Sequence, residues 1–181
     1  MQNTFQTFSI KFIDIMIGII LGLGFQWWPN LTEPWMYMAF IFVYLDIIDY
    51  WIDYSPAMRR FPPHHELELM LDMGLMFSLF LLIYSTQLTL TYFLLTFVIF
   101  RIIDIFWLWR VQAEYKPKGT DGVFIGTYIK IDIVEVIGTL LLTMLAYSNL
   151  ASALILLIIF ILFRITMRIV ASLTYKKIHF V

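Results

Sequence analysis

The sequence predicts an all-α, polytopic integral membrane protein whose six transmembrane helices form one domain over residues 1–181. Composition is the first observation behind this prediction. Hydrophobic residues make up 61% of the chain and its mean hydropathy is +0.85, whereas soluble domains are about half apolar. The second observation is that the apolar residues form runs of about 20, the length that an α-helix needs to cross a hydrocarbon core.

Six such runs are predicted as spans: 9–28, 35–54, 67–86, 88–110, 128–147 and 150–173. Prolines end the first run in "WWPNLTEPW" (27–35) and the second in "SPAMRRFPPHH" (55–65), because proline interrupts a helix. The polar segment "QAEYKPKGTDGVFIG" (112–126) separates the fourth and fifth runs. Uncharged hairpins at 85–86 and 148–149 join the other neighbouring runs.

The first run is predicted to remain as a transmembrane helix. Lys11 precedes its apolar residues, but no small-residue cleavage site follows, so a cleaved signal peptide is not expected. Gly18 and Gly22 in "GIILGLG" (18–24) have the spacing of small residues at close helix contacts. The sequence leaves open whether that contact lies within the chain or between copies of it.

The basic residues of the connections predict the orientation. They lie in or beside the second and fourth connections and the C-terminal tail, whereas the three opposite connections contain no Lys or Arg. Because cytoplasmic loops carry the excess of Lys and Arg, both termini and loops 55–66 and 111–127 are predicted to be cytoplasmic, in a plasma or inner membrane. The residues are Arg59, Arg60, Arg110, Lys116, Lys118, Lys176 and Lys177. Tryptophans mark the two interfaces: Trp27, Trp28 and Trp35 on one side, and Trp51, Trp107 and Trp109 on the other.

Charged residues within the spans form one layer toward their cytoplasmic ends. Four segments, 15–32, 34–45, 73–100 and 136–163, contain no charge at all. Within each helix the charges lie three, four or seven residues apart and so share one face. Ionised groups at depth are costly unless they are paired or hydrated, so we expect these faces to converge on a shared chamber. The predicted members are Asp14, Asp46, Asp49, Asp53, Glu68, Asp72, Arg101, Asp104, Asp132, Glu135, Arg164 and Arg168.

A weak internal repeat places one charge at the same depth in three spans. The segments are "FVYLDIID" (42–49), "FVIFRIID" (97–104) and "FILFRITM" (160–167), and they align Asp46, Arg101 and Arg164. This register predicts three repeated helical hairpins.

Carboxylates outnumber bases among the groups near the membrane. Ten acids (Asp14, Asp46, Asp49, Asp53, Glu66, Glu68, Asp72, Asp104, Asp132 and Glu135) stand against six bases (Lys11, Arg101, Arg110, Lys130, Arg164 and Arg168), an excess of four. Shared protons, bound cations, water or the loop arginines Arg59 and Arg60 can relieve such an excess. The layer therefore favours the handling of cations or protons, and no cofactor other than a bound cation is expected. The structural alternative is a network of ion pairs that holds the helices together.

Two local motifs have weaker implications. "HHELE" (64–68) offers His64, His65 and Glu66 as candidate metal ligands at the mouth of the third span. Adjacent histidines on a helix point in different directions, so a shared metal site would need a loop conformation, and a polar cap is the alternative. "KGTDG" (118–122) is predicted to be a turn, and it has no nucleotide-binding pattern.

Four acidic residues in the second and third spans resemble the motif of the CDP-alcohol phosphatidyltransferases, six-span enzymes with four metal-binding aspartates on helices 2 and 3. These residues are Asp46, Asp49, Glu68 and Asp72. Arg101 and Lys130 fall where such enzymes carry basic residues. The resemblance implies metal-dependent transfer of a lipid headgroup.

The chain also departs from that family's pattern. Tyr50 follows the second aspartate where the family has glycine, and Asp53 and Tyr54 stand where it continues with Ala-Arg. The later glycine is absent, Glu68 replaces an aspartate, and the interval is one residue longer. The specific part of the resemblance is confined to residues 46–72.

Three classes of function follow. The first is permeation or transport of cations or protons through a transporter or channel, and the uncharged outer half then predicts a hydrophobic gate or a path between copies in a homo-oligomer. The second is a membrane-anchoring subunit that docks a soluble cytoplasmic partner protein. The third is the lipid-headgroup enzyme, although the short loops and the lack of a nucleophile–base motif argue against catalysis. The lipid bilayer is the expected surrounding in every case, and no nucleic acid is expected as a partner.

Overall fold

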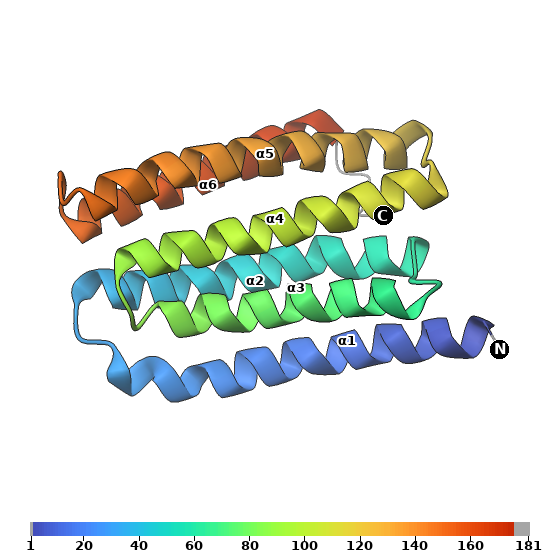
Figure 1. Cartoon of the computed structure of the whole chain (residues 1–181), viewed down its shortest axis with the longest axis horizontal. Helices are drawn as coiled ribbons and strands as arrows, with labels where there is room; N and C mark the ends of the chain where they lie inside the picture. The colour runs from blue at the N-terminus through green and yellow to red at the C-terminus, as the bar shows by residue number, and fades with distance from the viewer. Residues whose placement is uncertain (1, 176–181) are drawn as a thin grey trace. The chain divides into compact units, whose positions relative to one another are not determined.

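The structure, a computed structural model, describes residues 2–175, and within them it contains helices and connections but no strand (Figure 1). The all-α prediction is confirmed. The elements are α1 (Gln2–Gly24), the 3-10 helix η1 (Phe25–Asn30), α2 (Pro34–Arg60), α3 (Glu66–Ser85), α4 (Leu90–Tyr115), α5 (Gly119–Tyr147) and α6 (Ala153–Tyr175). Lys176 and Lys177, which contributed to the predicted orientation, lie outside the described residues.

Five stretches of helix are long and apolar enough to cross a membrane, which is consistent with a membrane protein. They are Ile10–Asn30, Pro34–Arg60, Glu66–Ser85, Leu90–Tyr115 and Ala153–Thr174. α5 is not among them, and Lys130, Asp132 and Glu135 interrupt its apolar sequence. The prediction of six spans is therefore not confirmed for α5.

Large apolar side chains are exposed along α2, α5 and α6. Leu45, Leu141 and Leu162 are examples, each with more than half of its surface accessible. Contiguous apolar exposure of this kind is rare on soluble monomers and is expected of helices that face lipid.

The predicted break after the second span is wrong in its position, because α2 continues through Pro56 to Arg60. Proline removes one backbone hydrogen bond, but Ala57 and Met58 behind it are buried and hold the last turn in place. The helix ends at Arg60, and the N–H of the next residue, Phe61, donates to the Ala57 carbonyl at 2.9 Å.

The segment "KGTDG" is not a turn, because α5 begins at Gly119. Gly119 has a positive φ of 61°, which glycine adopts at little cost. Asp121 lies in the first turn of α5, where a negative charge complements the helix dipole. These glycines therefore lie at the start of α5 and do not form a separate turn between α4 and α5.

The contacts divide the chain into two compact units, Met1–Gln87 and Leu88–Val181. In the first, α1 packs on α3 and α2, and the Tyr44 hydroxyl donates to the Leu21 carbonyl at 2.8 Å. A Cβ built on Gly18 or Gly22 meets no described atom within 4 Å, so within the first unit these glycines make no close contact with α2 or α3.

The second unit consists of α4, α5 and α6. α5 packs along α4 and also contacts α6. The Phe160 ring of α6 packs edge-on against Phe93 and Phe97 of α4, with centroids 5.7 and 4.8 Å apart. The boundary between the units falls between α3 and α4, inside the second predicted hairpin, and the three-hairpin repeat is not confirmed.

Candidate functional site

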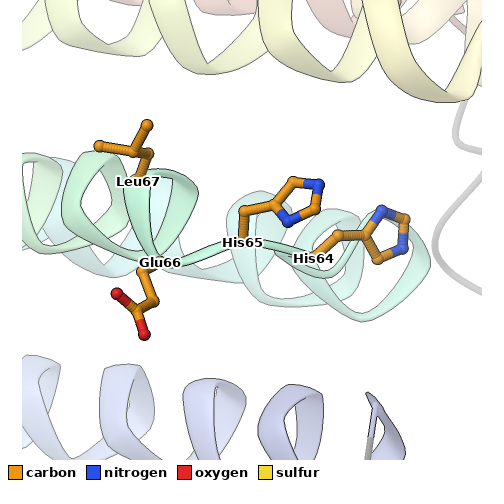
Figure 2. A pocket seen from close by; sticks show the side chains of 4 residues that line it. All are labelled: His64, His65, Glu66 and Leu67. Carbon is orange, nitrogen blue, oxygen red and sulfur yellow. The ribbon is translucent and has the colours of Figure 1, made fainter.

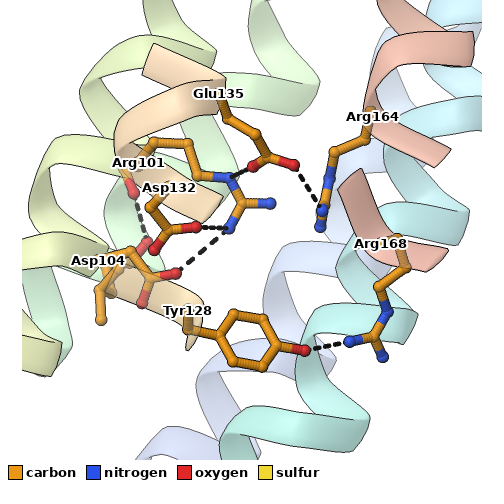
Figure 3. A network of polar contacts seen from close by, with 9 residues as sticks. Arg101, Asp104, Tyr128, Asp132, Glu135, Arg164 and Arg168 are labelled. Carbon is orange, nitrogen blue, oxygen red and sulfur yellow. Dashed lines mark hydrogen bonds and ion pairs between the residues drawn. The ribbon is translucent and has the colours of Figure 1, made fainter. Parts of the chain in front are cut away.

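A buried cluster of five charged side chains lies within the second unit (Figure 3). Two come from α4, two from α5 and one from α6, and in both α4 and α5 the pair is three residues apart and so shares a helical face. We call this group the charge cluster: Arg101, Asp104, Asp132, Glu135 and Arg164.

Arg101 is the centre of the charge cluster, and only 1% of its surface is exposed. Its Nη1 lies 3.2 Å from Asp104 Oδ2 and 3.5 Å from Asp132 Oδ1. Its Nε lies 2.8 Å from Glu135 Oε2. The guanidinium also lies over two aromatic rings of its own helix, 5.1 Å from the Phe97 centroid and 4.7 Å from that of Phe100. One cation therefore contacts three carboxylates and two ring faces.

Glu135 bridges the two arginines. Its Oε1 accepts a hydrogen bond from Arg164 Nη1 at 2.9 Å, while Oε2 faces Arg101. Glu135 has no exposed surface, and Arg164 is buried as well. With every group ionised, three carboxylates and two guanidiniums give the cluster a formal charge of −1.

Asp132 is held less closely than the other two acids. Only 1% of its surface is exposed, and neither of its carboxylate oxygens accepts a hydrogen bond from any described residue. Its nearest charged nitrogen is Arg101 Nη1 at 3.5 Å, the longest contact in the cluster.

Arg168 and Lys130 lie outside this group. Arg168 on α6 donates a hydrogen bond to the hydroxyl of Tyr128 on α5 (Figure 3). The Lys130 side chain is exposed, so it does not balance the buried acids.

Acidic side chains of the first unit have separate partners. Asp46, Glu68 and Asp72 are buried. The Tyr54 hydroxyl donates to Asp72 Oδ1 at 2.7 Å, and the backbone N–H of His64 donates to Glu68 Oε2 at 2.6 Å.

Three more exposed acids of the predicted set lie on α1 and along α2. Asp49 and Asp53 are half-buried, so exposure increases along α2 from Asp46. Asp14 lies 3.9 Å from Arg59 in an open pair. The structure thus brings together five of the twelve predicted charged residues in one cluster, and a single chamber for all six helices stays a prediction.

Two tyrosines of the site were missed by the sequence prediction. Tyr54 lies eight residues after Asp46 and Tyr128 four residues before Asp132, so helical spacing places each on the same face as an acid. Hydroxyl side chains at these intervals from an acid indicate both tyrosines, whereas the pattern of charges indicates neither.

His64, His65 and Glu66 line a shallow, open depression together with Leu67 (Figure 2). The Glu66 carboxylate points to the opposite side of the chain from the two imidazole rings. These three side chains therefore do not converge on one point, and a metal site built from them would require a rearrangement at the start of α3.

No family model matches the sequence, and comparisons with curated proteins and with solved structures find no match either. The resemblance to the CDP-alcohol phosphatidyltransferases gains no support from these comparisons. Inferences about function therefore depend on the geometry of the site.

Proposed function

We propose that the protein is an integral membrane protein that moves protons or cations, and that the charge cluster lies on their path. The formal charge of −1 in a fully buried group is the observation that carries this proposal. An excess of carboxylates over guanidiniums at such a place is unfavourable, so a mobile positive species that approaches these acids binds favourably.

We propose further that α5 is the sixth span. Its 29 residues extend about 44 Å at 1.5 Å per residue, longer than a hydrocarbon core. Asp132 and Glu135 lower its hydropathy, but both face Arg101 within the unit, so they need not contact lipid. The distribution of Lys and Arg supports cytoplasmic termini and a cytoplasmic position for the charged layer.

The three acids of α2 line a vestibule within the first unit in this proposal. Asp46 is buried, whereas Asp49 and Asp53 are half-buried, a gradient expected of a vestibule that opens toward the Asp53 end. The uncharged segments 73–100 and 136–163 make an open water-filled pore through one copy unfavourable. Passage then needs a hydrophobic gate or a path between copies in a homo-oligomer.

Flux into liposomes that contain the purified protein tests this function. A pH-sensitive dye inside the vesicles reports protons, and a cation-sensitive dye reports metal cations. Asp46→Asn is expected to reduce the flux strongly because it removes the buried charge. Asp53→Asn, nearer water, is the matched control and should have a smaller effect.

Three other results would contradict the proposed transport or the role of the α2 acids in it. A flux that neither variant changes, in protein shown to be folded, would remove the acids of α2 from the path. If no flux occurs, the anchoring subunit that docks a soluble cytoplasmic partner becomes the better account. Headgroup transfer that depends on Mg²⁺ or Mn²⁺ would instead make the acids of α2 and α3 metal ligands.

A further inference from the structure

We propose that the positive species held by the charge cluster is a single proton, and that Asp132 carries it. This inference deepens the proposed function and rests on it. The ligand is a proton, and the Asp132 carboxylate binds it.

The three carboxylates of the cluster have unequal surroundings. Both oxygens of Glu135 face a guanidinium nitrogen, at 2.8 and 2.9 Å, so Glu135 bridges the two arginines. Asp104 and Asp132 instead share one nitrogen, Arg101 Nη1. A single nitrogen of Arg101 thus faces two carboxylates, at 3.2 and 3.5 Å.

The contacts with Arg101 differ between Asp104 and Asp132, and this difference indicates which aspartate carries the proton. Asp104 accepts a hydrogen bond from Arg101 at 3.2 Å, whereas Asp132 accepts none from the described residues and approaches Arg101 only to 3.5 Å. The Oδ2 atom of Asp132 is buried without a hydrogen-bond partner among those residues. A buried, ionised carboxylate oxygen without a donor is unfavourable, and protonation of Asp132 removes that charge while Asp104 keeps its own.

The charged groups of the cluster around Asp132 fit this assignment. They are Arg101 and Asp104 on α4, Glu135 on α5 and Arg164 on α6. Protonated Asp132 leaves two guanidiniums opposite two carboxylates, Asp104 and Glu135. The charge cluster is then neutral.

A metal cation fits the charge cluster poorly. Hard cations such as Mg²⁺ and Ca²⁺ take about six or more oxygen ligands. Both oxygens of Glu135, Oδ2 of Asp104 and Oδ1 of Asp132 already face guanidinium nitrogens. A metal ion would lie beside two cations with few oxygens left to bind it. A proton needs only one oxygen atom.

Infrared spectroscopy of the full-length protein in lipid tests the assignment, because a protonated carboxylic acid has a C=O band that a carboxylate lacks. We expect such a band at neutral pH, and it should shift when aspartate is labelled with ¹³C at its carboxyl group but not when glutamate is labelled. Asp132→Asn should abolish the band. Asp53→Asn, on the half-buried part of α2, is the control and should retain it.

A conservative exchange separates the two aspartates even if the asparagine variant folds poorly. In Asp132→Glu the band should become sensitive to labelled glutamate, whereas in Asp104→Glu it should stay sensitive to labelled aspartate. A band that follows labelled glutamate in the unmodified protein, or that moves with Asp104→Glu, would overturn the assignment. So would loss of the band on addition of Na⁺ or Mg²⁺ alone, since a metal cation would then be the ligand.

The experiments distinguish failure of the transport proposal from failure of the Asp132 proposal. An Asp132 band without any flux would retain the proton site and remove transport as the function. Flux that depends on Asp46, without an aspartate band, would retain transport and remove the proton from Asp132.

Discussion

At the scale of single residues, Arg101 shows what the sequence can and cannot predict about a buried charge. Its place in an apolar run predicts that it needs acidic partners, and Asp104 follows from the spacing of three residues. The contacts with Asp132 and Glu135 depend on how α4 and α5 are rotated about their axes. Periodicity places a residue on a face but does not say which face of the neighbouring helix it meets.

Removal of Arg101 should destabilise the protein more than removal of Arg101 together with one acid. We expect Arg101→Met to lose about 3–5 kcal/mol because it leaves buried carboxylates without their cation. Arg101→Met combined with Glu135→Gln should lose less. Unfolding in detergent with a denaturant measures both. Arg59→Met is the control, since its open pair with Asp14 should contribute about 0–1 kcal/mol. Additive losses in the double variant would contradict an energetic coupling within the cluster.

The hydroxyl of Tyr54 should contribute to stability through Asp72. Tyr54→Phe keeps the ring, which stacks on Tyr50 with centroids 5.2 Å apart, and removes only the donor to a fully buried acid. We expect a loss of about 1.5–3 kcal/mol, typical of a hydrogen bond to a charged group. The melting temperature in detergent reports it. Tyr147→Phe, at a tyrosine that is 80% exposed, should leave the melting temperature unchanged.

At the scale of helices, the sequence predicts that helices exist better than it predicts where they begin and end. Pro56 and the glycines of 118–122 are typical of breaks, yet the first lies inside α2 and the glycines lie at the start of α5. In both cases neighbouring contacts outweigh the local preference. For α2 these are the buried Ala57 and Met58. For α5, Gly122 allows a close approach of the Pro117 carbonyl.

That approach gives a test of how α5 begins. A Cβ at Gly122 would lie 2.7 Å from the Pro117 carbonyl oxygen, and because this is a backbone atom the first turn would have to shift. We therefore expect Gly122→Ala to lower the melting temperature. Gly126→Ala is the matched control one turn later, where a Cβ meets nothing within 4 Å. It should be neutral or stabilising by up to about 1 kcal/mol, because alanine favours a helix more than glycine does. Equal melting temperatures for the two variants would show that the first turn does not depend on this contact.

At the scale of the whole molecule, the sequence predicts the helical class and six spans, of which five are long and apolar enough to cross a membrane. The structure divides the chain into two units with three α-helices each, not into three hairpins. The repeat segments align one charge in each of three helices, but their surroundings differ. Arg101 and Arg164 share Glu135, whereas Asp46 lies in the first unit. A sequence repeat of apolar residues therefore does not establish a repeat of contacts.

The crossing of α5 is the prediction on which the orientation depends. The chain contains no cysteine, so a single introduced cysteine can be labelled without background. If α5 crosses and the termini are cytoplasmic, an impermeant thiol reagent added to intact cells should label Asn149→Cys after α5 but not Lys118→Cys before it, since basic loops stay on the cytoplasmic side. Arg60→Cys, in the other basic connection, should behave like Lys118→Cys, and permeabilised cells should allow labelling at all three positions. Labelling of both Asn149→Cys and Lys118→Cys from outside would place the two ends of α5 on one side. In that case Asp132 and Glu135 would reach the cluster from a helix that does not span the bilayer, and the charge cluster would lie near an interface and not along a path across the membrane.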